Sequence, residues 1–573
     1  MSDCNSNLRS RWVFVLHRRK ICVRLASSVG DTAANDNKGS PRLDSPDRQL
    51  PRLPKVVFVL GAVAYRWRFE ASAPATISTR TQYLRQYHIR FVMAYFLKKI
   101  LESANRLNSS NSSSSSSLNL NFSISSHASV SDQIIVCSSS TGEFDRIPID
   151  IFMQILKLLG PKEAAKLIVV CKSWKLIVSC NNLWIYYLQN KKDPWDAMFF
   201  AESNLRSGYP LRSYPSQMQS FMQIYGQRAQ VPGAIIIDGG SGYSKFGWSK
   251  YGSPSGRAST FMEFGNIESP VYSRLRHFFA TMYSRMQVKP SSQPTVVSIP
   301  ISQYGDREAA KTARRQLKEA VYSALFDLNV PSVCAINQAT LALFAAKKTS
   351  GILVNIGFHQ TCVVPILNGK IMHKVGVESM GVGALKLTGY LREQMQQRNL
   401  NFSSLYTVRT LKEKLCYVAI DYEGELRKDT EASYEVPVEG LFTLKQERFR
   451  TGEILFQPRI AGLRTASGLH QAVAICLEHC HAAGLTPDET WFKTIVLAGG
   501  TACLPGVVER LEKELYVLLP PSISNGIRVI PPPHGADSAW HGAKLLSNLS
   551  TFPDSWCITK KDFRPKSRRN FIW

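Results

Sequence analysis

This chain of 573 residues has no Cys-x-x-Cys pairs, no long apolar runs and comparatively few acidic residues. Each of these features limits the class of protein to which the chain can belong. None of its twelve cysteines stands in a Cys-x-x-Cys pair, and thiols scattered in this way favour a reducing, intracellular compartment. Apolar runs are short. Even residues 56–64 cannot span a bilayer, so we expect a soluble protein with no membrane partner. Acidic residues number 43 against 70 Lys and Arg, which gives a formal net charge of +27.

The positive charge is enriched at the two ends of the chain. Residues 1–92 hold 16 Lys and Arg against 6 Asp and Glu, and residues 560–573 hold 6 against 1. Such charge permits nuclear targeting or nucleic-acid contact without selecting a fold, and a solvated tail is the plainer interpretation. We expect localisation in the nucleus, the nucleolus included, or in nucleus and cytoplasm together. We favour protein partners over nucleic acid.

Residues 1–140 form an Arg- and Ser-rich extension for which we predict disorder. They show no sustained apolar period, and the tract from Ser109 is mostly Ser and Asn. Such a composition buries too little apolar surface to offset the entropy of ordering. Two alternatives stay open. The first stretch is a transit peptide, or translation begins at Met93 and residues 1–92 are a gene-model extension.

A small all-α domain is predicted over residues 141–190. Its sequence indicates three short helices, the first ended by Gly160-Pro161. The ordered set Ile-Pro, Ile-Leu, Val-Cys-Lys-Ser-Trp and Leu-Trp between residues 145 and 187 resembles the F-box motif. F-boxes bind the Skp adaptor of cullin-type ubiquitin ligases. The resemblance implies adaptor contacts at Ile147, Pro148, Ile151, Leu156 and Trp174.

The rest of the chain divides into a connector and a second domain. Residues 191–230 are rich in aromatic residues, and Trp195, Phe199 and Phe200 would be costly to leave in water. We therefore expect residues 191–230 to be a packed connector. The second domain follows over residues 231–573.

A glycine turn between two apolar strands suggests an anion site in the second domain. Ile235 to Ile237 run into the turn at Asp238 to Gly242, and the chain returns over Tyr243 to Trp248. Glycines let backbone amides approach a phosphate, and Lys245 can add a cation. Asp238 can hold a metal through its waters. One such hairpin is weak support, because many hairpins have Asp-Gly turns.

A second hairpin repeats this backbone without its chemistry. Residues 352–354 form an apolar run, the chain turns at Gly357, and a second run follows over residues 361–366. Asn355 and Phe358 stand where catalytic phosphate hairpins carry carboxylates for metal or water. Two hairpins of this kind resemble the paired phosphate loops of the actin, heat-shock-70 and sugar-kinase group, and that resemblance implies a nucleotide-shaped cleft with impaired hydrolysis.

Longer blocks resemble actin and the actin-related proteins from about residue 231 to the C-terminus. They cover residues 407–423, 446–458, 495–515 and 538–563. The resemblance implies an α/β, actin-like fold, which is duplicated and ribonuclease-H-like. An F-box ahead of such a fold is similar to one plant branch of the actin-related proteins.

The same resemblance implies an ATP site, matched residue by residue. The matching positions are Asp238, Gly240, Ser241, Gly242, Lys245, Gln338, Gly357, Arg409, Lys412, Glu413, Gly499, Gly500 and Thr501. Gln338 falls where actins orient the attacking water, and Gly357 is all that the second loop retains, because His359 replaces a glycine. Each glycine could also serve the turns of the fold alone. We expect ATP as a structural ligand with slow or no hydrolysis and no catalytic residue.

One cluster could hold a metal, although we expect no structural metal. Cys476 and Cys480 would share a helix face near His479 and His481. The favoured interpretation is an amphipathic helix with two buried thiols and exposed histidines.

The predicted small subdomain is reduced. Actins insert a whole subdomain, with a filament contact, where this chain has about twenty residues between Trp248 and Ser269. A segment this short cannot fold as a lobe, so we expect no filament.

These patterns together predict a non-polymerising, non-catalytic adaptor. The F-box would recruit the Skp–cullin ligase, and the actin-like domain would present an unidentified protein for ubiquitylation. One rival is a nuclear actin-related subunit of a chromatin complex, which would not need an F-box. The other is an ATPase switch, against which the second hairpin argues.

Overall fold

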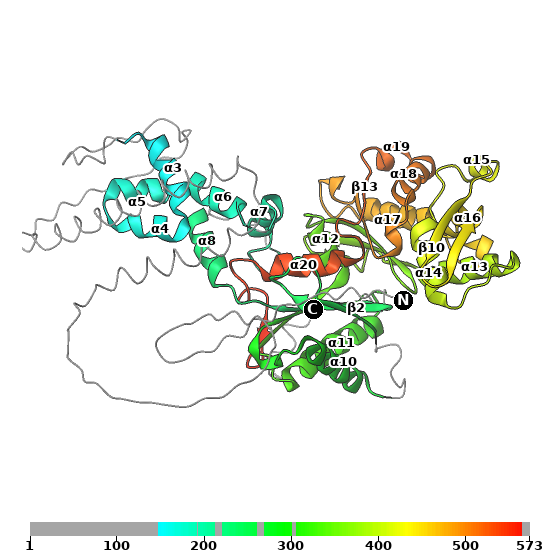
Figure 1. The fold of residues 1–573 in the computed structure, drawn as a ribbon, viewed down its shortest axis with the longest axis horizontal. Helices are drawn as coiled ribbons and strands as arrows, with labels where there is room; N and C mark the ends of the chain where they lie inside the picture. Colours follow the sequence, from blue (N-terminus) through cyan, green and yellow to red (C-terminus); the bar gives the residue numbers. More distant parts are fainter. Residues whose placement is uncertain (1–146, 192, 212–219, 261–268, 301–304, 564–573) are drawn as a thin grey trace, which may run out of the picture. The chain divides into compact units, whose positions relative to one another are not determined.

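The computed structural model describes residues 147–191, 193–211, 220–260, 269–300 and 305–563 (Figure 1). The predictions for residues 1–140 and for the basic residues 564–573 lie outside these ranges. Within them, no helix combines the length and the apolar character needed to cross a membrane. The described residues form a small helical domain, a connector and a large α/β domain.

The small helical domain has one more helix than the sequence predicted. Its elements are α3 (Ile149–Leu159), α4 (Pro161–Lys166), the 3-10 turn η2 (Leu167–Val169), α5 (Lys172–Val178) and α6 (Asn181–Gln189). Gly160 ends α3 with a φ of 89°, and Pro161 starts α4, as expected. The Trp184 indole donates to the carbonyl of Val178 at 2.6 Å, and the Tyr187 hydroxyl donates to Leu156 at 2.5 Å. These bonds let large aromatics enter the core without stranding a polar atom.

The described residues of the connector include α7 (Trp195–Asn204) and α8 (Phe221–Gln230), and both helices contribute side chains to hydrophobic cores, as predicted. Phe199 is an exception, because it remains exposed. Helix α7 contributes to two hydrophobic cores at once. Met198 packs in the core of the small domain, whereas Ala201 and Leu205 pack in the core of the large domain.

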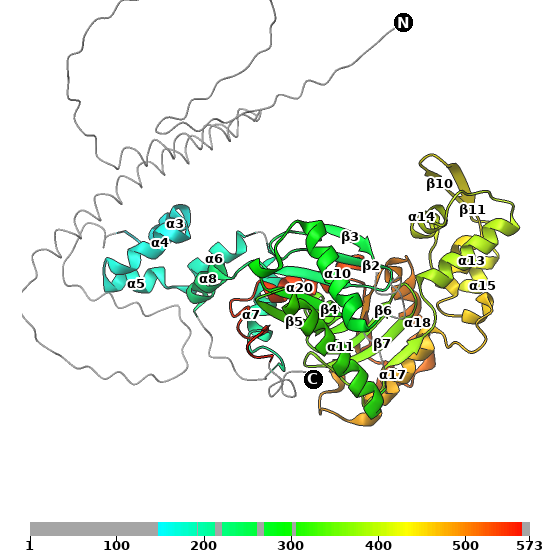
Figure 2. The ribbon, with the colours of Figure 1, turned by 90° about the horizontal axis from the view of Figure 1, so that it is seen from below.

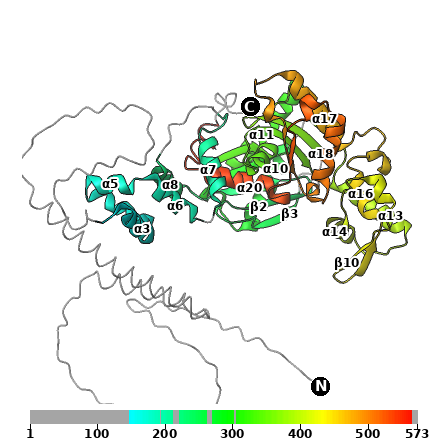
Figure 3. The ribbon, with the colours of Figure 1, turned by 90° about the horizontal axis from the view of Figure 1, so that it is seen from above.

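Hydrogen bonds also connect α7 and its C-cap to α8 and to the C-terminal segment. The buried carboxylate of Glu202 accepts from Arg228 at 2.9 Å and from the Ser550 hydroxyl at 2.6 Å. The Trp556 indole donates to the Leu205 carbonyl at 2.9 Å. Figures 1 and 3 draw α7 beside α20 (Ser538–Ser547), the helix that precedes this segment. The small domain is therefore joined to the large one by shared packing.

The large domain contains two sheets of six strands each. The strands of the first are β1 (Ile235–Gly239), β2 (Tyr243–Trp248), β3 (Gly256–Ser259), β4 (Thr295–Ile299), β5 (Ser332–Asn337) and β14 (Ile558–Thr559). The strands of the second are β6 (Gly351–Ile356), β7 (Thr361–Leu367), β8 (Lys370–Ile371), β9 (Glu378–Met380), β12 (Thr494–Ala498) and β13 (Arg528–Ile530).

The two sheets share one arrangement. In the first, the antiparallel hairpin β1–β2 continues through parallel β4 and β5. In the second, the hairpin β6–β7 continues through parallel β12 and β13. This repetition is the duplicated α/β fold that the sequence predicted.

Helices separate and cover the sheets. Between the sheets lie α12 (Gln338–Ala345) and α20, which approach so closely that a Cβ on Gly542 would come 1.8 Å from the Leu341 oxygen. The outer face of the first sheet is covered by α10 (Val271–Met286) and α11 (Glu308–Asp327), side by side in Figure 2. The outer face of the second is covered by α17 (Leu469–Ala483) and α18 (Val507–Leu518).

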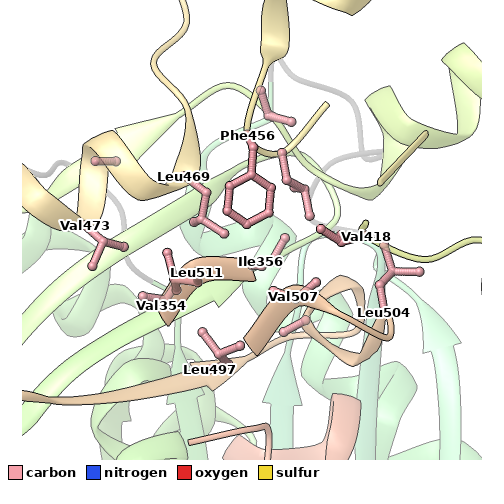
Figure 4. Close-up of a cluster of buried hydrophobic side chains, with 14 of the residues drawn as sticks. Val354, Ile356, Val418, Phe456, Leu469, Val473, Leu497, Leu504, Val507 and Leu511 are labelled. Carbon is pink, nitrogen blue, oxygen red and sulfur yellow. The ribbon is translucent and has the colours of Figure 1, made fainter. Parts of the chain in front are cut away.

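Side-chain alternation along the strands builds these layers. Ile235 and Ile237 face α10 and α11, whereas Ile236 faces the layer between the sheets. In the second sheet Val354 and Ile356 point into the outer core with Leu469 and Leu511 (Figure 4). The first strand of each hairpin, β1 or β6, is thus buried on both faces, which fixes its register and the place of its turn.

The two halves differ in what is added beyond the sheets. The second half carries a lobe made of α13 (Ala384–Gln397), α14 (Leu405–Leu415), α15 (Tyr422–Leu426), α16 (Glu447–Glu453) and the hairpin β10 (Ala432–Val436) and β11 (Gly440–Leu444). In the first half, the described residues between Trp248 and Ser269 form only the strand β3. The small subdomain is reduced, as expected.

The remaining elements are short and lie in the connections. They are η3 (Pro290–Ser292), η4 (Pro458–Ala461), η5 (Glu489–Trp491), η6 (Thr501–Cys503), α19 (Pro521–Ser524) and η7 (Gly535–Asp537).

Candidate functional site

A cavity of about 850 Å³ lies between the two hairpins. Of the thirteen positions predicted from the sequence, twelve line it: Gly240, Ser241, Gly242, Lys245, Gln338, Gly357, Arg409, Lys412, Glu413, Gly499, Gly500 and Thr501. The thirteenth, Asp238, is 0 % exposed and lies behind the cavity wall. The fold therefore brings together residues spread over more than 250 positions of the chain.

Asp238 is held in a closed polar network. Its Oδ1 accepts from the Ser298 hydroxyl at 2.5 Å and from the Gln338 amide at 2.8 Å, and its Oδ2 accepts from Lys245 at 3.1 Å. Burial alone would raise the pKa of Asp238, but the Lys245 charge and these hydrogen bonds lower it below its ordinary value of 3.8. The carboxylate is ionised and paired inside the protein.

This network corrects the interpretation of Asp238 and adds protein partners to Lys245. Asp238 does not face the cavity, so it is not placed to hold a metal through waters there. Lys245 does line the cavity, but its ammonium also donates to the backbone oxygen of Ala536 and lies 3.9 Å from Asp537. Its charge is already shared with two carboxylates.

The second hairpin is closed by backbone contacts. The Gly357 amide donates to the Gln360 oxygen at 3.0 Å, which forms the turn between β6 and β7. The first amides of α13, from Ala384 and Leu385, donate to the oxygens of Gly357 and Phe358 at 3.0 and 2.9 Å. The start of this helix therefore caps the hairpin, and these two amides are not directed at a ligand.

Phe358 joins the two hairpins. A Cβ on Gly242 would lie 2.9 Å from the Phe358 ring, so the aromatic side chain rests directly on the first turn. His359 packs edge-on against the same ring, with the centroids 4.8 Å apart. The residue that replaces a carboxylate thus forms an apolar contact across the cavity.

Helix α14 supplies the wall opposite the first hairpin. Arg409 donates to Glu413 at 2.8 Å and to the Tyr243 hydroxyl at 2.8 Å, with its guanidinium 4.8 Å from the Tyr243 ring centre. Lys412 is buried and donates to the Thr388 hydroxyl at 3.0 Å, and its burial lowers the pKa of the ammonium. A second contact between the two halves therefore passes through Arg409.

The glycine pair after β12 completes the cavity. Gly499 has a φ of 91°, and a Cβ there would come 2.3 Å from the Ile356 oxygen. The backbone of β12 thereby passes close to the end of β6, with Gly500 and Thr501 on the cavity wall.

Charge at the cavity is mainly positive. Among the described residues that line it, the cations are Lys245, Arg257, Arg285, Arg409 and Lys412, and the carboxylate is Glu413. Arg257 pairs with the nearby Asp537 at 2.6 Å. The arrangement suits an anionic ligand held against glycine-rich backbone.

Sequence reasoning missed the partners that complete this site. Ser298 lies within the buried strand β4, one residue before its end, and a polar residue at that position was the available signal. Asp537 and Tyr243 carried no such signal, because they meet the site only through long-range packing.

The small domain presents an apolar surface, but not the one predicted. Leu156 is 0 % exposed and Trp174 is 6 % exposed, and both belong to the domain's own core. Their assignment as adaptor contacts is therefore wrong. Ile147 is partly buried against this core, Pro148 is exposed, and Ile151 is 50 % exposed. Other large apolar side chains in water on this domain are Ile149, Leu158, Val169 and Leu176.

The Cys476 and Cys480 thiols are both buried on α17, as the amphipathic interpretation expects. His481 lies 3.2 Å from Glu489 instead of facing the thiols. Within the described ranges, no group of three His, Cys, Asp or Glu side chains is arranged to hold a metal ion.

Comparison with known protein families agrees with both parts of this architecture. A model of the F-box domain matches residues 144–186, and a model of actin matches residues 275–411 and 401–569. The chain belongs to the actin family and carries an F-box ahead of its actin-related domain.

Curated relatives sharpen this classification. The protein named Actin-related protein 8 of Arabidopsis thaliana is 66% identical over 437 residues, which cover 76% of this chain and 93% of that protein. Proteins of the same name from the indica and japonica subspecies of Oryza sativa are 60% identical over 435 residues, covering 75% of this chain and 90% of theirs. The expected similarity to a plant branch of the actin-related proteins is confirmed.

Proposed function

We propose that this protein is a substrate-recruiting adaptor of a Skp–cullin–F-box ubiquitin ligase. The F-box binds the Skp-type adaptor, and the actin-related domain binds the protein to be ubiquitylated. The supporting observation is the apolar surface of the small domain. Its core is already closed around Leu156, yet Ile149, Ile151 and Leu176 remain exposed, and apolar side chains left in water by a complete core suit a protein partner.

A binding measurement with the full chain and a purified Skp-type adaptor tests this proposal. Ile151→Asp should weaken the complex at least about tenfold, because a charge would be placed in an apolar contact. The variant should fold normally, since Ile151 is already half in water. Leu441→Asp is the matched control, because Leu441 on β11 is 70 % exposed and lies outside the F-box. Equal affinity of the Ile151 variant and the unmodified chain would contradict the proposal.

The cleft, in this proposal, holds an adenine nucleotide as a structural ligand. The glycine turns at Gly242 and Gly499 would admit the phosphates and the adenosine, and Lys245 and Arg409 would meet their negative charge. Hydrolysis should be very slow, because Asn355 and Phe358 cannot position a water or a metal as carboxylates do.

Ligand-induced stabilisation tests the nucleotide part. ATP should raise the melting temperature of the purified chain through selective binding to the native state, while phosphate release stays near background. Fast turnover would instead favour an ATPase switch. A melting temperature that does not respond to ATP or ADP would count against any nucleotide role.

The proposal also includes a monomeric, nuclear or nucleo-cytoplasmic protein. We expect a monomer because filament contacts would need a lobe where the described chain has only β3. We expect nuclear localisation because the chain has a formal net charge of +27. Sedimentation in Mg-ATP and salt should leave the protein in the supernatant. A pelleting fraction would overturn this point.

A further inference from the structure

Divalent cations that accompany nucleotides need oxygen ligands from the protein or from its ordered waters. Mg²⁺ in such sites is usually held by one or two carboxylates together with phosphate oxygens. In a cleft of the actin type those carboxylates would come from the two hairpins. In this chain the two hairpins carry Asp238 and Asn355 at equivalent positions.

The first hairpin provides one carboxylate, that of Asp238, but the ammonium of Lys245 is already in contact with it. Both oxygens of Asp238 already accept hydrogen bonds, and the side chain has no exposed surface. The ammonium of Lys245 lies 3.1 Å from Oδ2, on the cavity side of the pair. A cation of the protein is therefore already in contact with the group that would attract a metal.

The second hairpin offers no carboxylate at all. Asn355 occupies the position of β6 that Asp238 occupies in β1, and an amide oxygen carries no net charge. Phe358 covers the turn with an aromatic ring that rests on Gly242. Neither side chain supplies the charge that a hard divalent cation requires.

The other carboxylates at the cleft are paired with arginines. Glu413 accepts from Arg409 at 2.8 Å, and Asp537 accepts from Arg257 at 2.6 Å. With their partners Asp238 and Asp537 counted beside Glu413, the five cations of the described lining stand against three carboxylates. An incoming polyanion therefore meets fixed positive charge, whereas an incoming divalent cation meets repulsion.

We propose that the cleft binds its nucleotide as the metal-free polyanion, with side-chain cations in place of Mg²⁺. This inference rests on the nucleotide binding proposed above and adds the ionic form of the ligand. The donor set does not fit a divalent ion, so no step of binding depends on one.

Calorimetric titration of ADP and ATP into the full chain tests the inference in two buffers, one with excess EDTA and one with excess MgCl₂. We expect the affinity in EDTA to equal or exceed that in Mg²⁺, because complexed nucleotide carries less negative charge. Affinity at least tenfold weaker in EDTA would overturn the inference and leave nucleotide binding intact. Absence of binding in both buffers would overturn the nucleotide proposal and this inference with it.

A single substitution sharpens the test. Asn355→Asp adds a carboxylate without a lysine beside it, so nucleotide binding in EDTA should weaken about tenfold and Mg²⁺ should restore it. Asn399→Asp makes the same chemical change at an exposed position after α13 and should leave both titrations unchanged. If Asn355→Asp responds to Mg²⁺ no differently from the unmodified chain, the position does not control metal use and the inference fails.

Discussion

The two hairpins of the actin-related domain have one backbone and two chemistries. Asp238 in β1 stands between Lys245 on the hairpin partner and Ser298 on the parallel neighbour. Asn355 in β6 stands between Cys362 and Ala498 at the equivalent places. The first hairpin has a complete set of polar partners around a buried charge, and the second has lost the charge together with its partners.

The shape of the two turns and the chemistry of the cavity between them are therefore maintained by different residues. Alternating apolar side chains in β1 and β6 hold the turns in place on both sides. The ion pair in the first hairpin now serves stability, since its members bind one another. Two turns can therefore have the same shape while they present different side chains.

The largest expected effect separates the hairpins by stability. Asp238→Ala should cost about 3–5 kcal/mol in the free energy of unfolding, because it leaves Lys245 without its partner in a mostly buried site. Asn355→Ala, at the equivalent position, should cost only about 1 kcal/mol, since no charge is stranded. Urea unfolding of both variants measures the difference. Equal costs would show that the network around Asp238 is not what holds the first hairpin.

The contact between the hairpins should be next in size. Gly242→Ala should cost about 1–3 kcal/mol, because the new Cβ would overlap the Phe358 ring. Adding Phe358→Ala should recover part of that loss in a double-mutant cycle. Gly252→Ala is the control, since a Cβ there has no neighbour within 4 Å. A cycle with no coupling energy would mean that the turns are positioned independently.

A smaller effect should appear in the dependence of stability on pH. The folded pKa of Asp238 is lowered, so its ionised form stabilises the native state fully above the ordinary value of 3.8. That contribution is lost as the pH falls below this value toward the folded pKa. Stability curves of the unmodified chain and Asp238→Asn should therefore run parallel at neutral pH and converge in acid. If the two stability curves stay parallel at the lowest pH measured, the lowered pKa of Asp238 is contradicted.

The smallest effect is expected at the exposed contact across the cavity. Arg409→Ala should reduce stability by no more than about 1 kcal/mol, because the Tyr243 ring and hydroxyl remain accessible to water. Tyr243→Phe should cost still less, since it keeps the ring and removes only the hydrogen bond. Chemical denaturation resolves the two. A loss comparable to that of Asp238→Ala would place the main connection between the halves here instead.

Local patterns were enough to predict both hairpins, and family resemblance predicted twelve residues of the cavity lining. The apolar runs on either side of Gly240 and Gly357 have the alternation and turn residues of buried strands, and these signals lie within a few residues of one another. Twelve of the thirteen positions carried over by family resemblance line one cavity.

The parts that could not be predicted depend on contacts between distant segments. Ser298 lies 60 residues from Asp238, and the Ala536 oxygen that accepts from Lys245 lies 291 residues away. Leu156 and Trp174 were misassigned for a related reason. Apolar spacing marks a helix face as buried, but it does not tell whether the domain's own core or a partner covers that face. Only the packed structure distinguishes the two.

The position of α7 between two cores has a consequence for how the protein is made. The residues that cover its second face, Ser550 and Trp556, follow their partners on α7 by about 350 positions. At typical translation rates, roughly 20–70 s pass between the synthesis of α7 and the synthesis of Ser550 and Trp556. Until then Glu202 has Arg228 as a donor but lacks Ser550, and the Leu205 carbonyl lacks the Trp556 indole. A chain truncated before residue 550 would lack these hydrogen bonds, and we expect its α7 to be packed less stably. The complete contact between α7 and the large domain therefore requires residues 550–556 to have been synthesised.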